Sequence, residues 1–167
     1  MGSDGRRAAC RARWCGGDDR AGDAFVSRGG RSGRLTQQTS LAVGAALPTV
    51  TKTITQEKIN AYSLAGGDDN PLHTDVAFAA KTQFGGTIAH GMLVLAYVSE
   101  MLTAAFGEDW LASGRLKVRF RAPARPGDTL TTSGKVTSVG GGKTVCEIAC
   151  RNESGEVLVS GEAEVSR

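Results

Sequence analysis

The segment from Ala89 to Phe106 has the spacing of a helix that is apolar on nearly every side. Gly107 supplies its C-terminal stop, and its apolar residues are Met92, Leu93, Leu95, Ala96, Val98, Met101, Leu102 and Phe106. Such a helix has to be covered by other elements, because leaving it in water is unfavourable. The rest of the chain must therefore form a surface that surrounds this helix.

After the helix, the pattern changes to strands joined by short turns. Residues 115–121 (RLKVRFR) alternate strictly between polar and apolar side chains. Further strands are predicted at 129–139, 143–151 and 156–165. Short Gly-rich connections such as Gly140–Gly142 are typical of antiparallel neighbours. These patterns predict an antiparallel sheet.

The region before the helix predicts smaller elements. Residues 50–54 fit a first strand, and Thr55 caps a helix that ends at Gly66-Gly67. An irregular, non-helical arm and a short helix at 75–80 follow. Together the elements predict an α+β class with a single hot-dog fold, in which an antiparallel β-sheet wraps around a long central α-helix.

The N-terminal part differs in composition. Residues 1–42 hold eight Arg, no Lys and four Asp, without apolar periodicity, so we predict a disordered Arg/Gly-rich extension and place the domain at 43–167. A transit peptide is disfavoured by the four Asp, and a translated upstream stretch stays open. We assign this extension no function.

Charge and cysteine use exclude several function classes for the domain. Residues 43–167 hold 12 basic and 13 acidic residues, so no nucleic-acid partner is expected. No apolar run has the roughly 20 residues that a membrane span needs, so no membrane partner is expected. Cys146 and Cys150 fit buried positions on a strand, and Cys10 and Cys15 have no His nearby, so we expect no metal site and a cytoplasmic protein.

Candidate chemistry is concentrated between residues 62 and 91, which include both histidines of the chain, His73 and His90. In Asp68-Asp69-Asn70-Pro71-Leu72-His73, the proline stiffens an arm that can hold a carboxylate and an imidazole at a set separation. Such a pair can position a water molecule, take its proton and deliver a proton elsewhere. Asp68 and His73 are therefore the candidate acid/base pair.

The second cluster, Gly86-Thr87-Ile88-Ala89-His90-Gly91-Met92, precedes the apolar helix. Unpaired N–H groups and the positive end of the dipole at a helix start can polarise a carbonyl and stabilise an enolate-like oxygen. Gly91 has no side chain to block close approach to its N–H. His90 is expected to orient the helix start through hydrogen bonds more than to act directly.

The GDxNPLHxD motif of Gly67–Asp75, followed by FxxxIAHGM in Phe84–Met92, resembles the hydratase motif of MaoC-like (R)-specific enoyl-CoA hydratases and dehydratases. The stretch Lys117–Asp128 is also similar, and the resemblance covers roughly 48–165. It implies Asp68 and His73 as catalysts, Asn70 as their support, and the Gly91 amide as the oxyanion hole. One departure is Ala96, where some relatives have a serine.

The resemblance also implies an activity and partners. The activity is reversible syn hydration of a trans-2-enoyl thioester, carried by coenzyme A (CoA) or acyl carrier protein (ACP), to the (3R)-hydroxyacyl thioester. No metal or redox cofactor is implied, and a homodimer or dimer-based oligomer is expected. A hot-dog thioesterase and a non-catalytic acyl-binding subunit remain alternatives.

Other side chains allow weaker predictions. A basic strand face could bind the phosphates of CoA or an acidic carrier protein, with a solvated strand face as the alternative; it comprises Arg115, Lys117, Arg119 and Arg121. Tyr62 and Phe84 are expected to pack, with lining of an acyl tunnel as the alternative. Asp69 and Asp75 are expected to be structural.

Overall fold

A computed structural model describes residues 42–166. The disorder predicted for the extension falls, apart from its last residue, outside the described residues. In chain order the elements are β1 Val50–Thr53, α1 Gln56–Gly66, α2 Pro71–Thr74, α3 Val76–Ala79, α4 Gly91–Phe106, α5 Glu108–Ser113, β2 Arg115–Phe120, β3 Thr129–Gly140, β4 Lys143–Arg151 and β5 Val157–Ser166. No helix among them is both long and apolar enough to cross a membrane.

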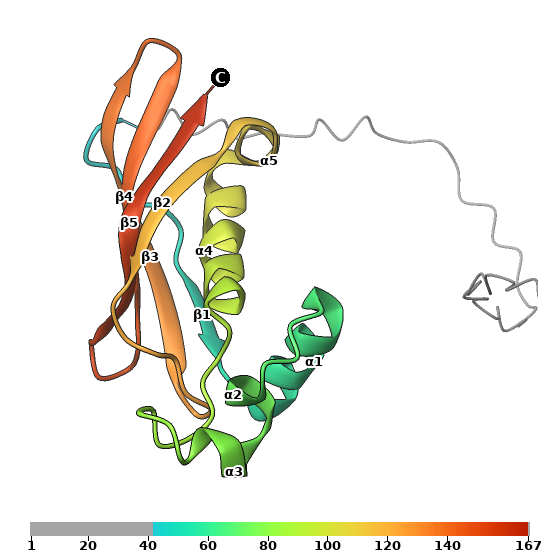
Figure 1. Ribbon diagram of the computed structural model, residues 1–167. Coiled ribbons are helices and arrows are strands. Elements are labelled where there is room, and N and C mark those ends of the chain that lie inside the picture. Colours follow the sequence, from blue (N-terminus) through green and yellow to red (C-terminus); the bar gives the residue numbers. More distant parts are fainter. Residues whose placement is uncertain (1–41, 167) are drawn as a thin grey trace, which may run out of the picture. The chain divides into compact units, whose positions relative to one another are not determined.

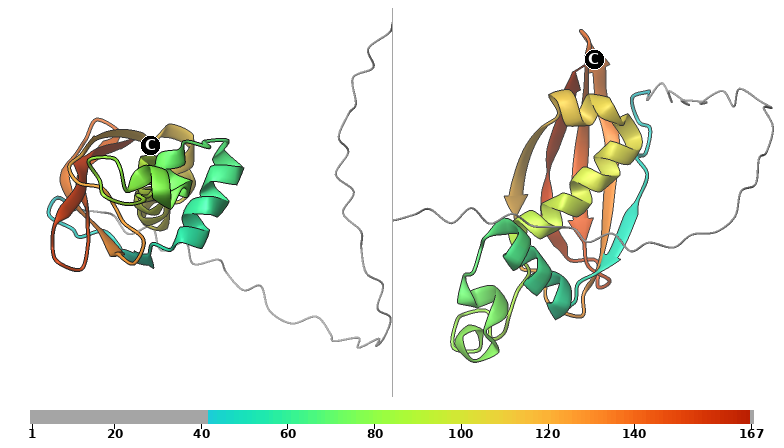
Figure 2. Two further views of the ribbon diagram at one scale, coloured as in Figure 1. Left: turned by 60° about the horizontal axis from the view of Figure 1, so that its bottom comes forward. Right: turned by 90° about the vertical axis from the view of Figure 1, so that its right-hand side faces the viewer.

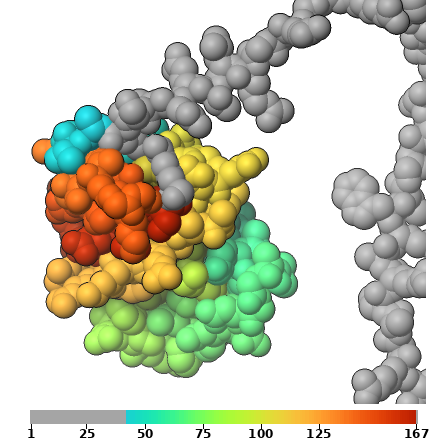
Figure 3. Space-filling model, turned by 90° about the horizontal axis from the view of Figure 1, so that it is seen from above, coloured from blue at the N-terminus to red at the C-terminus, as the bar shows by residue number. Residues whose placement is uncertain are grey.

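The five strands form one antiparallel sheet in the order β1-β3-β4-β5-β2. Strands β3, β4 and β5 follow one another through tight connections, whereas β1 and β2 come from earlier in the chain and form the two edges. Figure 3 shows the β2 region at the surface, between the β4–β5 strands and the segment around residues 75–90. Its outer edge pairs with no other described strand.

Helix α4 lies along one face of the curved sheet (Figures 1 and 2). Val98, Met101 and Leu102 are completely buried, and they pack in one core with side chains from β3, β4 and β5. The predicted α+β hot-dog arrangement, a sheet wrapped around a long helix, is therefore confirmed.

The helix is not covered on every side. Met92 is 61% exposed, and Ala96 and Glu100, each one helical turn further on, are also exposed. The sheet curves around only one side of α4, so a stripe on the opposite side remains open in the single chain. The expectation of burial on nearly every side was wrong for this stripe.

Helices α1, α2 and α3 gather at the end of the sheet where α4 begins (Figure 2). The arm after Asp68 was predicted to be non-helical, and this was wrong for its second half, because α2 starts at Pro71. Proline is tolerated in the first helical turn, where its missing N–H would have no partner. The short helix α5, which the sequence analysis missed, leads from α4 into β2.

Gly161 of β5 allows close packing against the edge strand β2. A Cβ at this position would lie 2.1 Å from the carbonyl oxygen of Lys117 and 2.8 Å from the Cα of Val118. Backbone atoms of a paired strand cannot move aside cheaply, so Gly161→Ala is expected to lower the free energy of unfolding by about 1–3 kcal/mol or more. Chemical denaturation measures the change.

The matched control is Gly140→Ala, because a Cβ at Gly140 meets nothing within 4 Å. Its free energy of unfolding should stay close to that of the unmodified protein. Equal stability of the Gly161→Ala and Gly140→Ala variants would contradict this packing.

Candidate active site

Asp68 is fixed mainly through its backbone. Its N–H donates to the carbonyl of Ser63 at 3.2 Å, and its own carbonyl accepts the Ser63 hydroxyl at 2.5 Å. The carboxylate Oδ1 accepts the N–H of Asn70 at 3.3 Å, and the side chain is 53% exposed. The end of α1 thus sets the peptide of Asp68 and leaves its carboxylate accessible.

Asn70 supports the arm by capping α2. Its side-chain oxygen accepts the N–H of Leu72 at 3.0 Å, a bond that satisfies a free donor at the helix start. The single turn of α2 then carries His73. Asn70 therefore orders the backbone between the two candidate catalytic residues, and no bond from its side chain to either of their side chains is recorded.

His73 is held by one ring nitrogen. Its Nδ1 lies 2.8 Å from the carbonyl oxygen of Ile88, which can only accept a hydrogen bond. Nδ1 must therefore carry a hydrogen, and in the neutral ring Nε2 is the basic nitrogen. This hydrogen bond prepares Nε2 to take a proton.

His90 is 2% exposed and lies just before α4. Its side chain makes no capping hydrogen bond to α4. Instead, Nε2 lies 3.3 Å from the Asp68 carbonyl oxygen and 4.0 Å from Oδ2 of the Asp68 carboxylate. Its Nδ1 is buried with no hydrogen-bond partner. Burial lowers the pKa of His90, and the bond to the Asp68 carbonyl opposes this effect.

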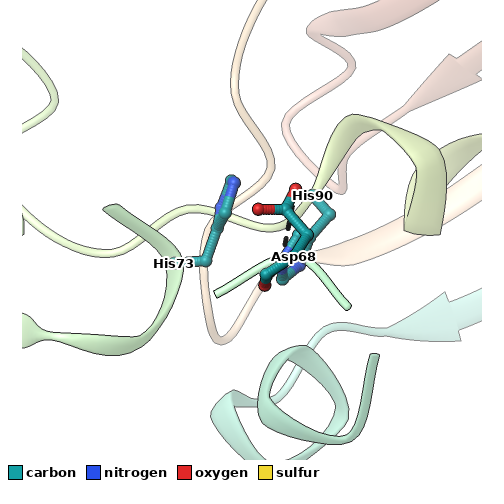
Figure 4. Close-up of side chains that lie close together, drawn as sticks. All are labelled: Asp68, His73 and His90. Atoms are coloured by element: carbon teal, nitrogen blue, oxygen red, sulfur yellow. Dashed lines mark hydrogen bonds and ion pairs between the residues drawn. The ribbon is translucent and has the colours of Figure 1, made fainter. Parts of the chain in front are cut away.

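Asp68 and His73 come from one arm and His90 from the residue before α4, and the three side chains lie close together (Figure 4). One oxygen or nitrogen atom of each lies within 4.8 Å of the others. The two imidazoles stack, with ring centroids 3.8 Å apart and an interplanar angle of 28°. Imidazole lone pairs lie in the ring plane, so stacked rings direct them side by side and not toward one shared ion. The geometry suits proton transfer better than metal binding.

A cavity of about 310 Å³ opens beside this cluster. His73 and Gly91 line it together with mainly apolar side chains, among them Phe84, Val94, Phe120 and Leu158. The apolar lining suits a hydrocarbon chain. Phe84, expected mainly to pack, thus also faces the cavity.

Gly91 begins α4 next to this cavity, where helix N–H groups lack partners within the helix. The ring of Phe120 lies against it, because a Cβ at Gly91 would come within 2.8 Å of the ring. Any larger residue would push this ring away. The absence of a side chain thus permits both close approach to the amide and an apolar wall beside it.

The basic face of β2 is divided in the structure. Arg121 lines the cavity. Arg115 and Lys117 pair in register with Glu164 and Glu162 of β5. A hydrogen bond from Lys143, together with the charge of Arg115, lowers the pKa of Glu164. Arg119, which lies opposite Ser160, is exposed.

The sequence analysis missed three polar groups that hold the site. Gln56 contacts both His73 and Thr87. Ser63 holds the Asp68 peptide. No local pattern identifies such partners, because they lie far along the chain or act on backbone atoms.

Comparisons with known proteins relate the chain to a described family. The sequence profile of the family described as MaoC like domain matches residues 38–157. An (R)-specific enoyl-CoA hydratase of Rhodospirillum rubrum is 32% identical over 120 residues, which cover 68% of this chain and 80% of the relative. A 3-hydroxybutyryl-CoA dehydratase of Methylorubrum extorquens is 32% identical over 119 residues, covering 68% and 73%.

A solved structure of a similar fold points to the same family. The (R)-hydratase from A. caviae, described as involved in PHA biosynthesis, has a TM-score of 0.68 and 30% identity, covering 77% of this chain and 98% of that chain.

The buried imidazole of His90 predicts a pH effect on stability. Because its pKa lies below 6.5 in the folded protein, the unfolded chain binds more protons as the pH falls below about 6.5. The stability that the neutral ring contributes is complete above that pH and is lost as the pH falls through the folded pKa. We expect the melting temperature to drop between pH 7.5 and 5.5, and to drop less in His90→Gln.

Thermal melts followed by circular dichroism measure both slopes. The control is His73→Gln. Burial is the main cause of the lowered pKa of His90 and the charge of His73 a smaller one, so this variant should keep most of the larger drop. Identical pH slopes for His90→Gln and the unmodified protein would contradict the assignment.

Proposed function

The chain belongs to the MaoC-like domain family, and from this premise we propose that it is a hydro-lyase acting on acyl thioesters. The proposed reaction is reversible syn hydration of a trans-2-enoyl thioester to the (3R)-hydroxyacyl thioester, with no cofactor. The observation that carries the proposal is the meeting of the Asp68 carboxylate, the His73 imidazole and the start of α4 beside an apolar cavity.

The thioester carbonyl is proposed to accept the N–H of Gly91. This amide belongs to the first turn of α4, so its hydrogen is not used within the helix. As water adds to C3, the electrons of the C2–C3 double bond move toward C2 and the carbonyl oxygen. A fixed donor and the helix dipole stabilise that developing charge without reorganising.

His73 is proposed to move the proton. Its Nδ1 is engaged with Ile88, so Nε2 takes a proton from water while the oxygen bonds to C3. The resulting imidazolium returns the proton to C2, which balances the addition. One group then serves one face of the double bond, in keeping with syn addition. The Asp68 carboxylate holds the water through its second hydrogen.

The direct test is hydration of crotonyl-CoA, followed by loss of ultraviolet absorbance. His73→Gln removes the group that transfers the proton, and Asp68→Asn removes the carboxylate that holds the water. Each should lower kcat by about 10²–10⁴-fold. Asp69→Asn is the matched control, because this neighbouring carboxylate is exposed and has no role in the mechanism.

Near-normal rates for Asp68→Asn or His73→Gln would reject the assignment. A thiol reagent separates the hydratase from a thioesterase, because only the thioesterase releases free CoA. Saturable acyl-CoA binding without turnover would instead favour a non-catalytic binding subunit.

Arg121 is proposed to bind the phosphates of the thioester carrier. Among the four basic residues of the β2 region, this one lines the cavity. Arg115 and Lys117 lie opposite Glu164 and Glu162 in the strand register, and neither lines this cavity. The proposed compartment is the cytosol, which suits the free, buried thiols of Cys146 and Cys150.

A second copy of the chain is proposed to cover the open stripe of α4 and the unpaired edge of β2. Met92 and Phe120 are exposed there at 61% and 55%. Exposed apolar side chains and free strand edges favour association. Light scattering of the purified chain should give a dimer or a multiple of it, and a monomer at micromolar concentration would contradict this proposal.

A further inference from the structure

We infer that Gln56 is a positioning residue for His73: it joins the backbone of the catalytic arm to the segment before α4 and so holds the imidazole in place. This inference deepens the proposed function and rests on it. Gln56 is the first residue of α1, distant in sequence from both segments that it connects.

The amide of Gln56 uses both of its ends. Its nitrogen donates to the carbonyl of His73 at 2.8 Å and to the side-chain oxygen of Asn60 at 2.9 Å. Its oxygen accepts the hydroxyl of Thr87 at 2.8 Å. Because the His73 carbonyl can only accept, the amide nitrogen must face it, and this fixes the orientation of the amide.

These contacts close a ring of interactions. Thr87 is followed by Ile88, whose carbonyl holds Nδ1 of His73. His73 is thus held at its backbone by Gln56 and at its ring by Ile88, and Gln56 is itself bonded to the residue next to Ile88. A shift of either segment would move the carbonyl of Ile88 relative to the imidazole.

Burial makes this closed set of hydrogen bonds rigid. Thr87 is only 7% exposed, and Gln56 is partly buried. Hydrogen bonds shielded from water are stronger than exposed ones, and leaving one partner without the other is unfavourable. A donor and an acceptor are needed at one place, which an amide supplies and a carboxylate does not.

Gln56 is not needed to start its own helix. Thr55 already caps α1, since its hydroxyl accepts the N–H of Lys58 at 3.3 Å. Two of the three Gln56 bonds leave α1 for the site. The arrangement therefore serves the site more than the helix.

Gln56→Ala should lower kcat for crotonyl-CoA hydration by about 10–100-fold, because small misplacements of a catalytic group reduce rates strongly. KM should change little, since Gln56 does not line the cavity. Gln56→Glu should behave similarly, because its carboxylate faces the His73 carbonyl and cannot donate.

Matched variants separate positioning from folding. Thr87→Ser retains the hydroxyl and should keep most of the rate, whereas Thr87→Val should lose it as Gln56→Ala does. Glu57→Ala, an exposed neighbour on α1, should keep the unmodified kcat. Melting temperatures are measured alongside, and a loss of rate that follows the melting temperature across the series would overturn the inference.

The decisive measurement is the hydration rate of the double variant Gln56→Ala, His73→Gln. If Gln56 acts through His73, then Gln56→Ala should cost nothing further in a His73→Gln background. An equal fold-loss in both backgrounds would overturn the inference, because Gln56 would then act by another route.

A readout without turnover separates failure of this inference from failure of the proposed function. The chain has two histidines, so nuclear magnetic resonance assigns their ring signals with the single variant His90→Gln. Gln56→Ala should speed hydrogen exchange at Nδ1 of His73 and shift its signal, whether or not enoyl-CoA is hydrated. An unchanged Nδ1 signal would overturn the inference.

Discussion

The packing of α4 against the curved sheet is the constraint on which the rest of the structure depends. Val98, Met101 and Leu102 have no exposed surface, so the helix cannot slide or turn without opening the core. Its first residue, Gly91, is thereby fixed beside the cavity. The catalytic arm needs only to reach this fixed point, which it does through hydrogen bonds to the backbone and not through a core of its own.

The sequence predicted those parts of the fold that carry a periodic signal. The strand alternation of 115–121 and the apolar helix up to Phe106 reflect repeated burial, which leaves a mark at every turn or every second residue. The arm at Pro71 was only half predicted, because proline disfavours a helix interior but fits its first turn. The open side of α4 was missed, since an apolar residue pattern does not show which faces of a helix the rest of the chain covers.

For the candidate site, the sequence located the acid/base pair but not what holds it. Asp68 and His73 stand in a compact motif, whereas Gln56 and Thr87 are 31 positions apart and meet only in the folded chain. The buried Nδ1 of His90 has no sequence signal at all. Long-range polar contacts depend on the register of whole elements. They follow from the fold, and no local sequence pattern indicates them.

The order of the strands also affects how the chain folds during its synthesis. Strand β2 pairs with β5, which is translated well after it, so the growing polypeptide carries the exposed apolar surface of α4 before its cover is complete. Contacts this distant in sequence slow folding and leave aggregation-prone intermediates.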